Sequence, residues 1–395
     1  MTAQESAPTI QRRSSILSRQ FDHANEVKLL QTRPQRVTRV LTLIFLLVLP
    51  FLLATDFSPP LDFPWATWFT VVNFAIIASI GAVAMNLLSG YAGQVSVAHV
   101  AFLIVGSIVG AQFGEIWGVP FWFLLPLAAF WGALIGVIVG LPALRVRGLY
   151  LFMATLAVHF IAIFIFRRYQ VDQFGFSGIV YTAPTLPDWL LWIPGLDEGA
   201  NGEFTIRGNW RWYWLNLGVA ALCIGFAANL LRTSWGRAFI AVRENDAAAA
   251  FMGVNVTRVK LLVFSASSGL VAVSGVLASY YLGARSDESW TLEIVLDYVT
   301  MIVVGGFGSL LGGVFGAVFF YVTPVLLSWV RELPFLENIE WLQEHGHAVD
   351  QMMYGLCVVL VLLFKPSGIA GMWEDTRDAV GRFVERRKQG AADEQ

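Results

Sequence analysis

The sequence predicts an all-α, polytopic membrane protein with about ten transmembrane helices. Hydrophobic residues make up 56% of the 395 residues, charged residues make up only 14%, and the mean hydropathy is +0.63. A helix needs roughly 20 mostly apolar residues to cross about 30 Å of hydrocarbon, and runs approaching this length recur along the chain. A soluble globule could not bury so much apolar surface. We therefore expect one transmembrane domain, residues 40–365.

The apolar runs, taken in order, give the individual spans. We expect them at residues 40–54, 65–88, 97–113, 120–142, 149–166, 212–231, 261–283, 291–304, 312–330 and 351–364. Lysine and arginine concentrate in residues 1–39, in residues 366–395 and in residues 232–260, which we call the charged segment. Cations gather on the cytoplasmic side of membrane proteins. The distribution predicts cytoplasmic N- and C-terminal tails, a cytoplasmic charged segment and an outer loop at 167–211.

Glycines at four-residue spacing form three rows along the expected spans. Such rows allow helix backbones to approach closely within a membrane. We expect tight packing between helices of one chain, with a seam between two copies as the alternative. The rows are Gly106, Gly110 and Gly114; Gly132, Gly136 and Gly140; and Gly308, Gly312 and Gly316.

Polar residues and glycines interrupt the end of the second span and the start of the third. Irregular backbone within a membrane is tolerated where it is buried in protein or lines a wet cavity. The segment is therefore either part of a translocation pathway or a plain turn between spans. Asp297, on one helical face with Glu293, is a further pathway candidate. The other candidates are Asn86, Gly90, Gly93, Gln94, Ser96 and His99.

The charged segment contains the signals of a short helix. Asn245 or Asp246 can cap its start, four alanines follow, and Gly253 can take the left-handed conformation that ends a helix. We expect a helix of about seven to nine residues. A helix this short is unstable alone, so it either docks on a partner protein or rests on anionic lipid headgroups.

No catalytic motif competes with these features. The sequence lacks a phosphate-binding loop of the G-x-x-x-x-G-K-[ST] type and the H-E-x-x-H and G-x-S-x-G motifs. No cluster of His, Cys, Asp or Glu has metal-ligand spacing. We expect no enzyme activity, no catalytic residue, no metal, no bound cofactor and no nucleic-acid partner. If ATP drives transport, ATP and Mg²⁺ bind to other subunits.

Five stretches of the sequence resemble one family. It comprises the permease subunits of ATP-binding-cassette importers for branched-chain amino acids, with their amide and urea relatives. The stretches occur in the family's order: MNLLSGYAGQVSVAHVAF (85–102), LPALRVRGLYLFMATLA (141–157), SWGRAFIAVRENDAAAAFMGVNVTRVKLLVFSASS (234–268), MIVVGGFGSLLGGVFGA (301–317) and LFKPSGIAG (363–371).

The resemblance implies the fold and partners of an importer permease. The partners would be a second permease, two ATP-binding subunits, an extracytoplasmic solute-binding protein and membrane lipid, in a prokaryotic cytoplasmic (inner) membrane. Asn86, Gly90, Gly93, Gln94, Ser96 and His99 would lie near the translocation pathway. The residues implied to contact the ATPase are Gly236, Arg237, Arg243, Glu244, Asp246, Ala247, Ala248 and Gly253.

The solute stays open at this point. Gln173-Phe174 and Val158-His159-Phe160 stand where relatives usually have a Gly-Gly pair and a Phe-Gly-Glu run. A branched-chain amino acid, another amino acid, an amide or urea all fit. The competing class is a secondary transporter in which His99 and Asp297 couple solute to an ion.

Overall fold

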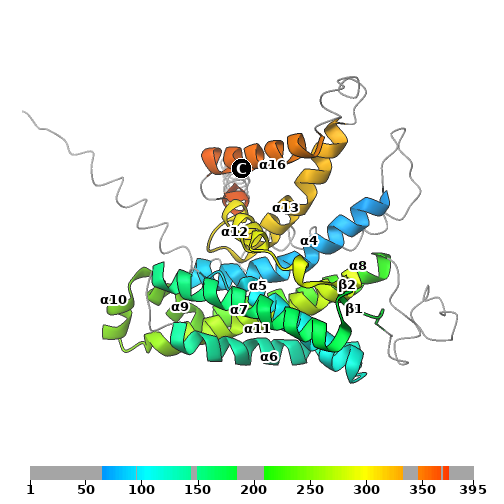
Figure 1. The fold of residues 1–395 in the computed structure, drawn as a ribbon. Coiled ribbons are helices and arrows are strands. Elements are labelled where there is room, and N and C mark those ends of the chain that lie inside the picture. The colour runs from blue at the N-terminus through cyan, green and yellow to red at the C-terminus, as the bar shows by residue number, and fades with distance from the viewer. Residues whose placement is uncertain are drawn as a thin grey trace, which may run out of the picture.

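The computed structural model describes residues 65–94, 96–143, 149–184, 209–331, 346–365 and 368–372, which are almost entirely helical (Figure 1). The expected span at 40–54, the N-terminal tail and nearly all of the C-terminal tail lie outside these residues. In order, the elements are α4 (Trp65–Met85), η1 (Asn86–Tyr91), α5 (His99–Val109), η2 (Gly110–Ile116), α6 (Phe121–Ala143), α7 (Leu149–Phe174), β1 (Ile179–Val180), α8 (Asn209–Arg232), α9 (Ser234–Glu244), α10 (Asp246–Phe251), α11 (Val256–Leu282), β2 (Ala284–Arg285), η4 (Asp287–Ser289), α12 (Glu293–Gly305), α13 (Leu310–Arg331) and α16 (Gly346–Phe364).

Seven of the described helices are long and apolar enough to cross a membrane. Two further expected spans are shorter. The apolar part of α16 begins at Ala348, and α12 has 13 residues, about 20 Å at 1.5 Å per residue, which does not cross the hydrocarbon. The all-α membrane class is confirmed, and the count of ten stays a prediction.

The boundary at residue 166 was wrong, because α7 continues to Phe174. Polar contacts stabilise this extra length. Arg168 forms an ion pair with Asp172 one turn later (3.0 Å), and Arg167 forms one with Asp287 (3.4 Å). The connection expected at 167–211 therefore begins at residue 175.

The two ends of the helix bundle differ in structure (Figure 1). One end carries α9 and α10, the elements of the charged segment. The other carries the antiparallel pair of β1 and β2, in which Ile179 lies opposite Arg285 and Val180 opposite Ala284. This pair joins the segment after α7 to the segment after α11. Both helices thus run toward the same end, as the expected topology requires.

Helix α11 is the centre of the bundle, and the glycine rows explain how closely it packs. A Cβ added to Gly106 of α5 would collide with the Ala272 carbonyl oxygen of α11. One added to Gly132 of α6 would lie 2.7 Å from the Ser268 carbonyl oxygen. In the third row, Gly316 of α13 meets the backbone of Met301 in α12 in the same way. Packing within one chain is therefore confirmed for these rows.

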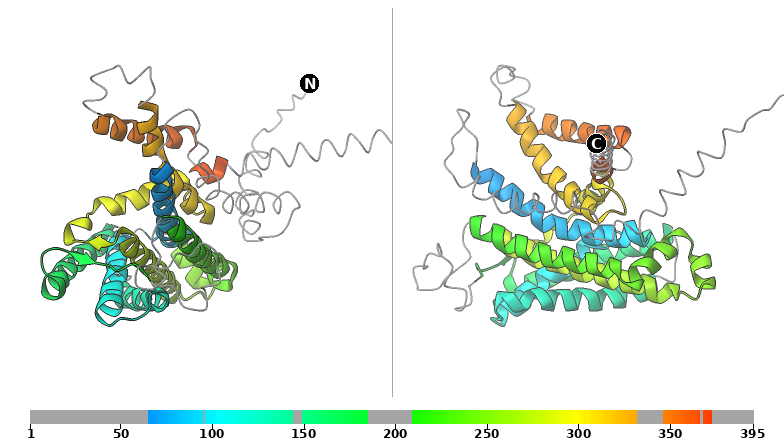
Figure 2. Two further views of the ribbon diagram at one scale, coloured as in Figure 1. Left: turned by 90° about the vertical axis from the view of Figure 1, so that its right-hand side faces the viewer. Right: turned by 180° about the vertical axis from the view of Figure 1, so that it is seen from behind.

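Helices α13 and α16 lie at one side of the bundle, where α13 packs on α4 and α12 (Figure 2). Gly313 gives α13 its close approach to α4, since an added Cβ would lie 2.9 Å from the Val83 nitrogen. On the opposite side, α6 and α7 expose large apolar side chains such as Phe130 and Phe164. In a membrane protein these faces contact lipid.

Candidate functional site

Side-chain caps shape the charged segment. The Thr233 hydroxyl accepts a hydrogen bond from the Trp235 nitrogen at the start of α9. The Asn245 Oδ1 accepts from the nitrogens of Ala247 and Ala248, both at 3.0 Å, and so begins α10. Such caps satisfy backbone N–H groups that have no partner within the helix. The Asn255 side chain starts α11 in the same manner.

The helix expected in this segment is present as α10, but it is shorter than expected and a second helix, α9, precedes it. α10 has six residues rather than seven to nine, because Met252 is its C-cap and Gly253 follows in the left-handed conformation with φ of +84°. The sequence did not lead us to expect the second helix. Residues 234–244 form α9, whose start is fixed by the Thr233 cap and whose close approach to α8 depends on Gly236. A Cβ there would collide with the backbone of Leu231.

The far end of α10 presents apolar surface. Phe251 is 91% exposed and Met252 is 85% exposed, and the side chains of Ala247 and Ala248 are also exposed. Exposed large apolar residues side by side mark an interaction site more often than chance exposure. Sequence reasoning chose the alanines and missed Phe251 and Met252, although both lie in the quoted family stretch.

Arg243, at the C-terminal end of α9, connects the charged segment to the interrupted span. Its Nη1 donates a 2.6 Å hydrogen bond to the carbonyl oxygen of Gly90 in η1. Its side-chain carbons also lie beside Gly93, whose φ is +67°. A cation at the carbonyl end of a helix is favourable, both as a donor and through the helix dipole. Arg243, Gly90 and Gly93 are thus brought together.

Asn86 connects the same segment to the turn between α12 and α13. Its Nδ2 donates to the carbonyl oxygens of Gly306 (3.1 Å) and Ser309 (2.6 Å), and its Oδ1 accepts from the Gly308 nitrogen (2.8 Å). Gly306 and Gly308 have φ of +128° and +81°. The glycines of this turn were visible in the sequence, but nothing local indicated that Asn86 would bind it.

Gln94 connects the interrupted span to α11. Its Nε2 donates to the Lys260 carbonyl oxygen (3.3 Å), while the Lys260 ammonium forms a partly buried ion pair of 2.5 Å with Asp246 of α10. The charged segment therefore contacts the interrupted span through two routes, one at Arg243 and one through Asp246 and Lys260. Arg237 and Glu244 are exposed, as is Arg243 despite its hydrogen bond to Gly90.

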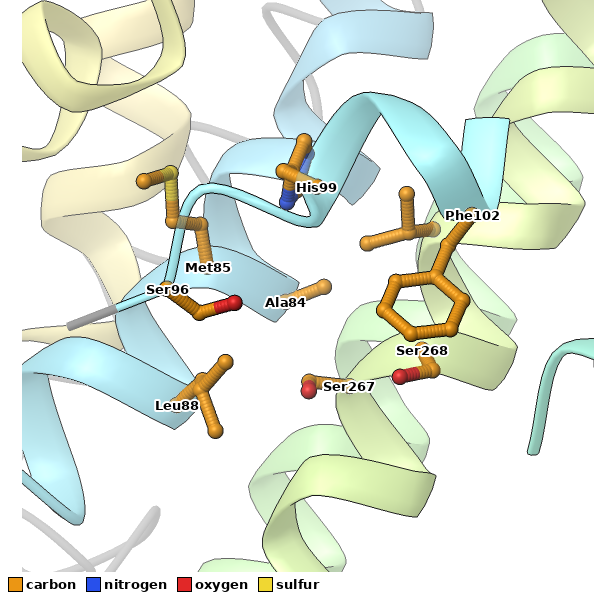
Figure 3. A pocket seen from close by; sticks show the side chains of 9 residues that line it. Ala84, Met85, Leu88, Ser96, His99, Phe102, Ser267 and Ser268 are labelled. Carbon is orange, nitrogen blue, oxygen red and sulfur yellow. The ribbon is translucent and has the colours of Figure 1, made fainter. Parts of the chain in front are cut away.

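His99 begins α5 and faces a small internal cavity of about 10 Å³ (Figure 3). Its ring lies 4.3 Å from the ring of Tyr298 in α12, and its Nε2 has no hydrogen-bond partner among the described residues. Ser96 lies on the same side as His99, and Ser267 and Ser268 face them from α11. A cavity of this size and polarity suits one water molecule.

Asp297 is not part of this cluster. It lies half-buried on α12, and no hydrogen bond or ion pair links it to the described residues between 86 and 99. The neighbouring Tyr298, rather than Asp297, contacts His99. The structure therefore brings six of the seven pathway candidates into one region and leaves Asp297 outside it.

A larger hollow of about 410 Å³ lies between α5, α6 and α7. Its lining is almost wholly apolar, including Phe102, Trp131 and Ile165, so it offers little that would recognise a polar solute. Within the described part of the chain, no group of three His, Cys, Asp or Glu side chains is placed to hold a metal ion.

Comparison with known proteins shows the family of the chain. Residues 67–362 match the family described as branched-chain amino acid transport system / permease component. No solved structure matches the chain.

Individual relatives carry transport names. The chain is 26% identical over 313 residues to the high-affinity branched-chain amino acid transport system permease protein LivM of Salmonella typhimurium, covering 77% of this chain and 69% of the relative. LivM of Escherichia coli is 25% identical over the same shares. The xylose transport system permease protein XylH of Haemophilus influenzae is 40% identical, over only 24% of this chain. The chain belongs to the family of branched-chain amino acid transport system permeases, as a multi-pass membrane subunit of ATP-binding-cassette transporters.

Proposed function

We propose that this chain is the membrane permease of an ATP-driven importer for a small polar solute, most consistent with a branched-chain or related amino acid. ATP and Mg²⁺ bind to two partner ATPase subunits, a second permease completes the membrane part, and an extracytoplasmic binding protein delivers the solute. The chain lies in a prokaryotic cytoplasmic membrane, with both termini and residues 232–260 on the cytoplasmic side.

The hydrogen bond from Arg243 to Gly90 is the observation that carries the proposal. It joins α9, one of the two helices of the charged segment, to the backbone of η1 in the broken span. Asn86, also in η1, binds the turn between α12 and α13. A charge-assisted hydrogen bond of this kind contributes about 1.5–3 kcal/mol. Movement of α9 and α10 would therefore be transmitted to the broken span rather than absorbed in a loose loop.

Transport would then follow alternating access. ATP binding brings the two ATPase subunits together and displaces the charged segment, and the rigid contacts carry that displacement to η1 and to the α12–α13 turn. Gly90, Gly93 and the left-handed glycines of the turn allow close backbone contact at this junction. Ser96, His99 and the cavity behind them lie next to the moving element.

Contact with the ATPase is assigned to α9 and α10. Gly236, Arg237, Arg243 and Glu244 belong to the first helix. In the second, Phe251 and Met252 supply apolar area beside the smooth surface of Ala247 and Ala248. An apolar tip surrounded by charges resembles the composition of protein interfaces, in which a buried apolar centre has a polar rim. The remaining contact candidates, Asp246 and Gly253, shape α10 rather than enlarge its surface.

The ATPase contact can be tested with Phe251→Asp. A carboxylate placed in an apolar contact must be desolvated without a partner, which is costly. We expect the ATPase subunits to co-purify with the wild-type permease pair and to be lost from the variant. Phe176→Asp is the control. Phe176 is 88% exposed and follows the C-terminal end of α7, at the end of the bundle away from α9 and α10. Full retention of the ATPase by Phe251→Asp would contradict the assignment.

The ion-coupled alternative has less support. It requires His99 and Asp297 to act together, and the described contacts place Tyr298 rather than Asp297 beside the imidazole.

A further inference from the structure

Arg285 occupies a fixed position at the end of the bundle opposite the charged segment. It follows α11, whose 27 residues separate the two ends by about 40 Å. Its backbone pairs with Ile179 in the β1–β2 ladder. Its guanidinium carbon lies 4.8 Å from the ring centroid of Trp290, which is 3% exposed and packs edge-on against Phe166. The side chain is thus held over an aromatic face.

The Arg285 guanidinium has no anionic partner within the described part of the chain. Two other arginines at this end, Arg167 and Arg168, form ion pairs with Asp287 and Asp172. The Nε of Arg285 is buried without a hydrogen-bond acceptor, and so is the Nε1 of Trp290. Two buried N–H donors in one contact therefore lack acceptors. Unsatisfied buried donors are rare in native structures and call for an explanation such as an absent ligand.

The surroundings of Arg285 are aromatic rather than acidic. Burial is the main influence on its pKa and lowers it, while Tyr181, Tyr298 and Tyr321 act on the guanidinium electrostatically. Arginine nonetheless stays charged in proteins. A partly buried cation without a counter-ion is unfavourable, and the arrival of a small anion would relieve that cost.

We propose that Arg285 binds the carboxylate of the solute at the outer end of the translocation pathway. The inference rests on the proposed import function and deepens it, since it selects a carboxylate-bearing solute over a neutral amide or urea. The fork of N–H donors in arginine matches a carboxylate in two-point contact. Half-buried between aromatic side chains, the group suits a small molecule better than an acidic side chain of a docked protein.

The position of Tyr298 connects this site to the interior. Tyr298 lies near enough to Arg285 to influence its pKa, and it contacts the ring of His99. His99 lines the cavity with Ser96, Ser267 and Ser268. Tyr298 therefore lies between the neighbourhood of Arg285 and the cavity beside the broken span. A solute released at Arg285 would meet these groups next.

The direct test uses the wild-type transporter complex without its binding protein. Phenylglyoxal modifies accessible arginines, and the modification of each arginine can be followed by mass spectrometry. We expect L-leucine to slow the modification of Arg285 at least threefold, L-leucinamide to leave it unchanged, and neither to affect Arg168. Equal protection by both compounds, or by neither, would overturn the carboxylate assignment.

Transport by variants provides the second arm. Uptake of L-leucine is measured in proteoliposomes containing the whole complex and its binding protein. Arg285→Gln should lower this uptake at least tenfold, and Arg285→Lys should lower it less. The control is Arg168→Gln, which removes an exposed ion pair with Asp172 and should leave uptake unchanged. Wild-type uptake by Arg285→Gln would overturn the proposal. If the wild-type complex showed leucine protection of Arg285 but no ATP-dependent uptake, the import function would fail while the binding site stood.

Discussion

Gly90 occupies a position with no room for a side chain. An added Cβ would lie 2.7 Å from the Gly308 backbone nitrogen and 2.9 Å from its Cα, while the Gly90 carbonyl accepts the hydrogen bond from Arg243. Asn86 holds the same turn from the side. At the scale of single residues, the junction therefore depends on close backbone approach that only glycine allows.

Substituting Gly90 by alanine should disturb both contacts. The methyl group must displace the α12–α13 turn, and overpacking of this kind costs about 1–3 kcal/mol. We expect a lower Tm for the purified complex and weaker coupling between ATP turnover and uptake. Gly355→Ala is the matched control, because nothing lies within 4 Å of a Cβ added at that position in α16. An unchanged Tm for Gly90→Ala would show that the turn yields freely.

Local signals in the sequence predicted some of these residues and could not predict others. Asn245 and Gly253 are recognised from neighbours a few positions away, because capping is a local property. The partners of Asn86 lie 220 or more positions along the chain, and no local pattern encodes such a pairing. Arg285 was not selected, because its stacking on Trp290 and its pairing with Ile179 exist only in the folded chain.

The elements of the charged segment are small and depend on their caps. α10 has six residues, too few to be stable alone, and its start is fixed by Asn245. The ion pair between Asp246 and Lys260 fastens it to α11. The sequence did not lead us to expect α9, because its charged residues Arg237, Arg243 and Glu244 suggested a loop. In the structure its apolar residue Phe239 is buried against the bundle.

Removing the cap should weaken the ATPase contact without removing any residue from its surface. Asn245→Ala leaves two backbone N–H groups unpaired and costs about 0.5–2 kcal/mol. If α10 must be helical to dock, ATPase binding should weaken roughly two- to thirtyfold. Titration of the ATPase against the reconstituted permease pair measures this. Asn245→Asp keeps the acceptor and should bind as the wild type does; equal weakening by both variants would argue against a capping role.

Across the whole molecule, one end holds the charged segment that we propose for coupling, and the other holds Arg285, which forms no ion pair with the described residues. α11 and α4 run between them, so both ends belong to one packed body rather than to separate lobes (Figure 1). The sequence predicted the membrane class, because composition alone determines it, whereas the cytoplasmic placement of the cation-rich segments stays a prediction. It could not predict how α12, too short to cross alone, would pack between α13 and His99.

The central claim is that Arg243 transmits movement of the charged segment to the broken span. The measurement that tests it most directly is ATP turnover stimulated by the solute-loaded binding protein, in proteoliposomes containing Arg243→Gln. We predict retention of the ATPase subunits with stimulated turnover reduced at least tenfold. Arg258→Gln is the control, since Arg258 is exposed at the start of α11 and its side chain forms no hydrogen bond or ion pair with any described residue. Stimulated turnover at the wild-type rate in Arg243→Gln would contradict the claim.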